Sequence, residues 1–252
     1  MLSPTTLPEL PGLARNGDAR SHPPRHTRHE MHLLPGYVSA VGMIVDRHRL
    51  EKTVAIHNQA RQAKPAPGAG GRVRSCRWPA AVPSGQDRAV RVVVLADTHA
   101  PRRWRVCPPR VAEHLRDADL ILHAGDVCTA PVLVELAEYA PVVAVLGNND
   151  GPDVAAWGAG PTAELDLDGL TVAMVHDSGP AVGRLARMRR RFPRADLVVF
   201  GHSHIPLDES AYGLRVFNPG SPTDRRRQPH GTLGVLRIDS GRLVEATILP
   251  VT

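Results

Sequence analysis

Seven side chains with metal-binding atoms stand just after short apolar runs of the chain, and together they could perform hydrolytic chemistry. They comprise two aspartates, one asparagine and four histidines: Asp97, His99, Asp126, Asn148, His176, His202 and His204. Oxygen ligands mixed with imidazole nitrogens suit Mn, Fe, Zn or Co better than a metal that prefers thiolates. The residue types therefore indicate a divalent-metal site.

The number of donors separates a catalytic site from a structural one. Seven side chains exceed the four that close a tetrahedral structural zinc site, and they suffice for two ions if one carboxylate is shared. Two ions roughly 3.5–4 Å apart can activate a bridging hydroxide and hold the oxygens of a phosphoryl group during in-line displacement. Taken singly, each motif is more often a turn or a cap than a ligand. We favour the metal site because all of them follow predicted strands.

The predicted elements account for that common position. The run at 89–96 is rich in β-branched residues, which is typical of a buried strand. Two more strands are expected at 119–123 and 141–146, with helices between the three at 107–116 and 130–139. This alternation predicts parallel strands with crossover helices, and ligands bind at the carboxyl ends of such strands.

After Gly160 the pattern changes towards hairpins, so the predicted fold class is mixed, α/β with α+β character. Asp168-Gly169 lies between two alternating segments and is a strong turn signal, and Ser240-Gly241 joins the last two strands. The elements expected in this part are strands at 162–167, 170–175, 196–200, 214–217, 232–238 and 243–249, and a basic helix at 182–192.

Residues 1–88 differ from the rest in composition. They contain 10 Pro and 8 Gly, and 13 Lys and Arg against 6 Asp and Glu. Such a segment cannot bury enough apolar surface to offset its ordering entropy, so we predict a disordered basic Pro/Gly/His-rich tail; alternatively, it precedes the true start codon. Residues 89–252 form the predicted catalytic domain, with 18 basic against 19 acidic residues. The net charge of +6 is therefore a property of the tail, and nucleic acid is not an expected partner of the folded domain.

The order of the motifs resembles the signature of the calcineurin-like metallophosphoesterase family over residues 90–252. The matching motifs are Asp97-x-His99, Gly125-Asp126, Gly147-Asn148-x-Asp150, His176 and Gly201-His202-x-His204. The small size, together with Asn218-Pro219-Gly220-Ser221, is most similar to the compact bacterial phosphodiesterase branch, which includes relatives of a eukaryotic retromer scaffold subunit. The resemblance implies a two-sheet β-sandwich flanked by helices, the αββα arrangement.

The resemblance also implies how the donors divide. It places Asp97, His99 and His204 on one metal and Asn148, His176 and His202 on the other, with Asp126 bridging the two. The implied activity is hydrolysis of phosphodiesters, small or nucleotide-like, by attack of a metal-bridging hydroxide. The implied cofactors are two divalent ions, Mn first, with Zn, Fe, Ni or Co as alternatives. The alternative function is a non-catalytic metal-binding scaffold; a complete donor set favours the enzyme.

The sequence departs from the family at position 149. Many members carry a histidine there that helps to protonate the leaving group, whereas this chain has Asn149. Asparagine cannot transfer a proton, and loss of a general acid typically costs ~10²–10⁴ in rate. We therefore predict a slower enzyme that favours good leaving groups. Asn149 and Asp150 are the catalytic candidates, and Asp150 is expected to orient its neighbours rather than to bind metal.

A few further residues are candidates for lesser roles. Arg225, with Arg226 and Arg227, could receive a substrate phosphate through bidentate contacts; a solvated basic turn is an equal alternative. His123 is expected to pack near the strand end, and Cys128 is interpreted as a buried, unreactive thiol. Three cysteines exclude a disulfide framework, and no apolar window is long enough to span a membrane. The absence of an export signal predicts a cytoplasmic protein, and a homo-oligomer is compatible with the sequence.

Overall fold

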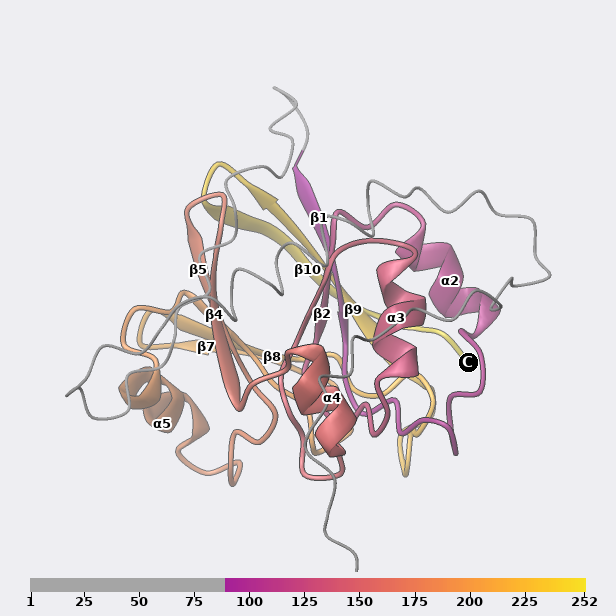
Figure 1. The fold of residues 1–252 in the computed structure, drawn as a ribbon. Coiled ribbons are helices and arrows are strands. Elements are labelled where there is room, and N and C mark those ends of the chain that lie inside the picture. The colour runs from indigo at the N-terminus through magenta and orange to yellow at the C-terminus, as the bar shows by residue number, and fades with distance from the viewer. Residues whose placement is uncertain (1–88) are drawn as a thin grey trace, which may run out of the picture. The chain divides into compact units, whose positions relative to one another are not determined.

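The computed structural model describes residues 89–252. The predicted tail at 1–88 lies outside the described residues. Within 89–252, ten strands form two five-stranded sheets. Four helices lie between strands along the chain (Figure 1). None of these helices is long and apolar enough to cross a membrane.

The first sheet combines three parallel strands with an antiparallel hairpin. Its order is β10 (Arg242–Pro250), β9 (Thr232–Asp239), β1 (Val90–Leu95), β2 (Leu120–His123) and β3 (Val142–Ala144). β1, β2 and β3 run parallel, whereas β9 is antiparallel to both of its neighbours. Parallel neighbours need crossover connections, and these contain α2 (Pro109–Leu115) and α3 (Pro131–Ala137), as the alternating pattern predicts.

The second sheet begins with the predicted hairpin. Its order is β4 (Thr162–Leu167), β5 (Leu170–Val175), β6 (Leu197–Val199), β8 (Leu214–Asn218) and β7 (Leu207–Ala211). β4 and β5 are joined by Asp168 and Gly169, whose φ angles are 54° and 94°; a two-residue hairpin turn of type I′ needs positive φ at both positions. β5, β6 and β8 are parallel, with α5 (Arg184–Arg191) between β5 and β6.

The core is divided among three interfaces between the layers. Val92 and Val94 of β1 face the second sheet, whereas Val93 and Leu95 pack beneath α2 and α3. β1 is thus buried on both faces, which is why its sequence is a continuous apolar run. Met188 of α5 packs on the outer face of the second sheet, so α2 and α3 lie on one side and α5 on the other (Figure 1). The predicted helix-flanked two-sheet fold is confirmed.

Two elements differ from the prediction. α4 (Pro152–Trp157) has only six residues, which is too short to show a helical period in the sequence. β7 was not expected because Leu207–Ala211 reads Leu-Asp-Glu-Ser-Ala and is largely exposed. It forms as an edge strand by antiparallel pairing with β8, so a tertiary contact rather than an apolar pattern produces it.

Candidate metal centre

The polar segments after five strands come together, and they come from both sheets rather than from one edge of a single sheet. In the first sheet, the Asp97 N–H donates to the Gly125 carbonyl (2.9 Å). In the second, the Gly201 N–H donates to the His176 carbonyl (2.9 Å). The His202 N–H donates to Asp97 Oδ1 (3.2 Å) and links the two sheets. The site therefore depends on how the sheets pack.

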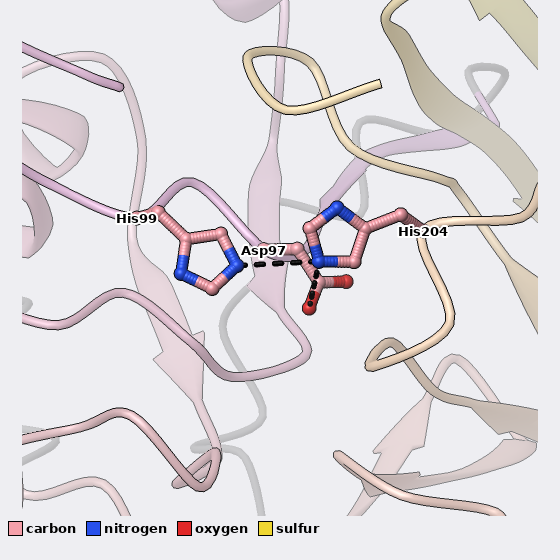
Figure 2. Close-up of side chains that lie close together, drawn as sticks. All are labelled: Asp97, His99 and His204. Carbon is pink, nitrogen blue, oxygen red and sulfur yellow. Dashed lines mark hydrogen bonds and ion pairs between the residues drawn. The ribbon is translucent and has the colours of Figure 1, made fainter. Parts of the chain in front are cut away.

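The first donor group consists of Asp97, His99 and His204, whose side chains point towards one another in Figure 2. His204 Nε2 lies 3.2 Å from His99 Nε2 and 3.4 Å from Asp97 Oδ1. The opposite nitrogen, His204 Nδ1, donates to the Asp224 carbonyl (2.6 Å). This hydrogen bond leaves a lone pair on Nε2. Two hydrogen-bond acceptors, His204 Nε2 and Asp97 Oδ1, therefore face each other without a proton between them.

Asp97 has an unusual environment for a carboxylate. It is fully buried, and its Oδ2 has no hydrogen-bond partner among the described residues. Burial raises its pKa to about 8, because a charged oxygen without partners is costly in the protein interior. A divalent cation would supply the missing partner and would also accept the lone pair of His204. The donor set therefore fits a metal ion.

The second donor group is Asp126, His176 and His202, with Asn148 beside it. His176 Nε2 lies 3.3 Å from His202 Nδ1 and 3.1 Å from Asn148 Oδ1. His176 Nδ1 donates to the Ala124 carbonyl (2.8 Å), so the neutral imidazole directs its Nε2 lone pair towards the group. His202 is exposed whereas His176 is buried, so this group has an open side.

Asp126, a member of the second donor group, also lies close to the first group. Its Oδ2 is 3.4 Å from His176 Nε2 and 3.8 Å from His99 Nε2. Asn149 donates to it twice, from its N–H to Oδ1 (2.8 Å) and from Nδ2 to Oδ2 (2.7 Å). Burial alone would raise the pKa of Asp126, but without a metal the hydrogen bond from a protonated His176 and the hydrogen bonds from Asn149 outweigh it and hold this pKa well below its usual range. An ionised carboxylate is thus within reach of both groups.

The backbone around the donors is strained. Non-glycine residues with positive φ cost about 1–3 kcal/mol each and cluster at functional sites, and five of the seven candidates have this conformation. They are Asp97 (56°), His99 (49°), Asp126 (56°), His202 (66°) and His204 (57°). Close packing adds a further constraint, since a Cβ at Gly147 would lie 2.2 Å from Asp126 Oδ1. Only glycine fits there without displacing the central carboxylate.

The carboxylate of Asp150 orders the backbone around Asp126. Its Oδ2 accepts hydrogen bonds from the N–H groups of Gly147 (2.6 Å) and Asp126 (3.1 Å), and its Oδ1 accepts one from the N–H of Cys128 (2.6 Å).

The expectation that Cys128 is buried is wrong, because this residue is partly exposed. Its Sγ lies 3.5 Å from His99 Nδ1, and burial together with neighbouring carboxylates raises the pKa of the thiol to about 11.

The segment at 219–231, which we call the arginine loop, forms hydrogen bonds with the backbone of the first donor group. The Ser221 hydroxyl donates to the Asp97 carbonyl (2.8 Å), and the Thr223 hydroxyl to the Thr98 carbonyl (2.9 Å). His123 Nε2 lies 3.1 Å from Thr98 Oγ1 in the buried interior. The hydrogen bond between the Asp224 carbonyl and His204 could not be predicted from the sequence, because every residue has a backbone carbonyl. The Asn218–Ser221 motif was the available indication.

Arg225, the predicted substrate-binding residue, is engaged within the arginine loop. Its Nη1 donates to the Gln228 carbonyl (2.5 Å), and the Gln228 N–H donates to the Arg225 carbonyl (2.8 Å). These two bonds close a turn. The guanidinium of Arg225 therefore stabilises its own loop.

Comparison with known proteins agrees with this architecture. A relative from Methanothermobacter thermautotrophicus, described as a probable metallophosphoesterase, is 34% identical over 156 residues, covering 60% of this chain and 87% of the relative. The solution structure of a Thermotoga maritima protein has a TM-score of 0.52 at 26% identity, covering 64% of this chain and 99% of that one. Entamoeba histolytica Vps29 complexed with Zn²⁺ has a TM-score of 0.53 at 20% identity, covering 65% and 100%, and shares the fold.

The two packed sheets and the paired donor groups thus define a protein of the metallophosphoesterase class. The sequence model described as "Calcineurin-like phosphoesterase superfamily domain" matches residues 90–241, which is more than half of the chain. The chain belongs to this superfamily, and the family resemblance seen in the motifs is confirmed.

Proposed function

We propose that this chain hydrolyses phosphodiesters with two divalent ions held by the two donor groups. Asp97, His99 and His204 would hold one ion, Asn148, His176 and His202 the other, and Asp126 both. The observation that carries the proposal is the position of Asp126 Oδ2, within 4 Å of an imidazole nitrogen of each group. Two ions bound there would supply Lewis-acid activation of the phosphoryl group and of water. Mn is the first candidate by resemblance to the family, with Zn, Fe, Ni or Co as alternatives that also accept mixed oxygen and imidazole donors.

The chain's own residues orient the donors and limit the leaving groups. Hydrogen bonds to backbone carbonyls set the tautomers of His176 and His204, so that both present Nε2. Asn149 keeps the Asp126 carboxylate oriented with two hydrogen bonds, but it cannot donate a proton to a departing alkoxide. Aryl phosphodiesters, whose phenolate leaving groups need less protonation, are therefore proposed as the better substrates, and nucleotide-like phosphodiesters, which release a sugar alkoxide, as the slower ones.

Two features support the enzyme over a non-catalytic scaffold. All seven donor positions hold competent ligands, and the backbone is strained at five of them. Strain of this kind persists where it serves a site, and a docking surface elsewhere on the fold would not require it. The cytoplasmic location and the homo-oligomeric state stay predictions.

Metal removal and one substitution test the proposal. The purified protein is stripped with chelator, reloaded with Mn²⁺ and assayed with bis(4-nitrophenyl) phosphate. Asp126→Asn keeps the shape of the side chain but removes its charge. We expect a loss of at least ~100-fold, since even outer-shell partners of metal ligands contribute 10–100-fold. His114→Gln, a change on α2, is the matched control and should keep full activity. Metal-loaded protein that binds ions but does not hydrolyse the ester would favour the scaffold instead.

A further inference from the structure

The arginine loop places positive charge beside the first donor group. Two hydrogen bonds hold it there. The Ser221 hydroxyl donates to the Asp97 carbonyl (2.8 Å), and the Asp224 carbonyl accepts from His204 Nδ1 (2.6 Å). Arg226 follows two residues after Asp224. Since two residues span at most about 7 Å, the Cα of Arg226 lies within that distance of a residue that contacts His204.

Arg226 differs from Arg225 in what its side chain does. Arg225 is held in the turn by its contact with Gln228. Arg226 is exposed, and it adopts a left-handed backbone with φ of 49°. Among residues 89–252, none forms a hydrogen bond or ion pair with its guanidinium. The nearby carboxylate of Asp224 lies 3.9 Å from Arg103 and 3.8 Å from His204 Nδ1. The guanidinium of Arg226 is therefore available to a ligand.

The charge of Arg226 acts on all three side chains of the first donor group. Burial raises the pKa of Asp97 to about 8, and the cation opposes this shift. Burial lowers the pKa values of His99 and His204, and the cation lowers them further. A positive charge that acts on these side chains also repels a metal ion held by them. That repulsion is relieved when an anion lies between the arginine and the metal.

We propose that Arg226 binds an unesterified oxygen of the substrate's phosphoryl group at the edge of the first donor group. The inference rests on the proposed function and assigns it a substrate-binding residue. A phosphodiester offers two such oxygens, so one can face the metals while the other accepts from the planar guanidinium, whose donors match phosphate geometry. A neutral phosphotriester lacks the charge that this contact requires.

Steady-state kinetics on the Mn²⁺-loaded full chain test the assignment. For Arg226→Gln we expect KM for bis(4-nitrophenyl) phosphate to rise about 10-fold or more, the value of a hydrogen bond between charged groups, with a much smaller change in kcat. Arg226→Lys should restore part of the loss, since it keeps the charge without the planar fork. Arg242→Gln is the charge-matched control, and its KM should equal that of the wild type. Arg242 is the first residue of β10 and lies near the amino end of β1, where Val90 pairs with Ile238. Asp97 follows the carboxyl end of β1, so Arg242 is remote from the first donor group.

A binding measurement separates this inference from the proposed function. Inorganic phosphate is titrated into the metal-loaded wild type, Arg226→Gln and Arg242→Gln by calorimetry, after circular dichroism has verified that each is folded. We expect affinity to fall about 10-fold in Arg226→Gln alone. Unchanged phosphate affinity and unchanged KM in this variant would overturn the assignment. If the wild type hydrolyses no phosphodiester but its phosphate binding depends on Arg226, the assignment stands and the proposed function fails.

Discussion

Replacement of Asp97 by asparagine should stabilise the metal-free protein while removing its response to metal. The Asp97 carboxylate is fully buried, with one oxygen lacking a partner among the described residues, and burial raises its pKa from 3.8 to about 8. Between these two pH values the folded state holds a proton that the unfolded chain has released. Stability of the metal-free wild type therefore falls as the pH rises from 4 towards 8.

The size of the effect follows from two opposing contributions. A shift of one pKa unit corresponds to about 1.4 kcal/mol, so the roughly three units between 3.8 and pH 7 cost the wild type about 4 kcal/mol. Asparagine removes this cost. Its amide group, placed where Oδ2 has no partner, adds an unsatisfied buried donor at about 1–3 kcal/mol. The net gain expected for Asp97→Asn at pH 7 is about 1–3 kcal/mol.

Urea denaturation with chelator present measures this gain, and pH provides an internal control. At pH 4 Asp97 is protonated in the folded wild type, so the advantage of the variant should vanish. With Mn²⁺ at a hundred times its Kd, the wild type gains about 2.7 kcal/mol of stability, whereas the variant should gain little. The difference in free energy of unfolding between the two proteins should therefore shrink or change sign. A variant less stable than the wild type at pH 7 in chelator would refute the reasoning.

Two further substitutions test the centre of the site. Asn149→His supplies the proton donor that the family usually carries; we expect a gain of about 10-fold or more on alkyl phosphodiesters and little on activated aryl esters, and an equal effect on both would contradict the missing-acid argument. Gly147→Ala should abolish Mn²⁺ binding in a titration, since its Cβ would lie 2.2 Å from Asp126 Oδ1. Gly160→Ala, whose Cβ would meet only a carbonyl at 3.5 Å, should bind normally.

Local patterns in the sequence were sufficient where the structure is local. β1 is a continuous apolar run because both faces of the strand are buried, and the Asp168-Gly169 turn matches the positive φ values that close the β4–β5 hairpin. Neither α4 nor β7 could be found in this way. α4 is too short to show periodicity, and β7 is a polar edge strand whose partner, β8, determines its conformation.

The sequence by itself determined the seven donor types, their order and their places at strand ends, because apolar periodicity and turn residues are local properties of a chain. Only the tertiary structure decided that two different sheets supply these donors and that one oxygen of Asp126 lies within reach of both groups. These relations join residues far apart along the chain. They arise from the packing of one sheet against the other, which no local pattern encodes.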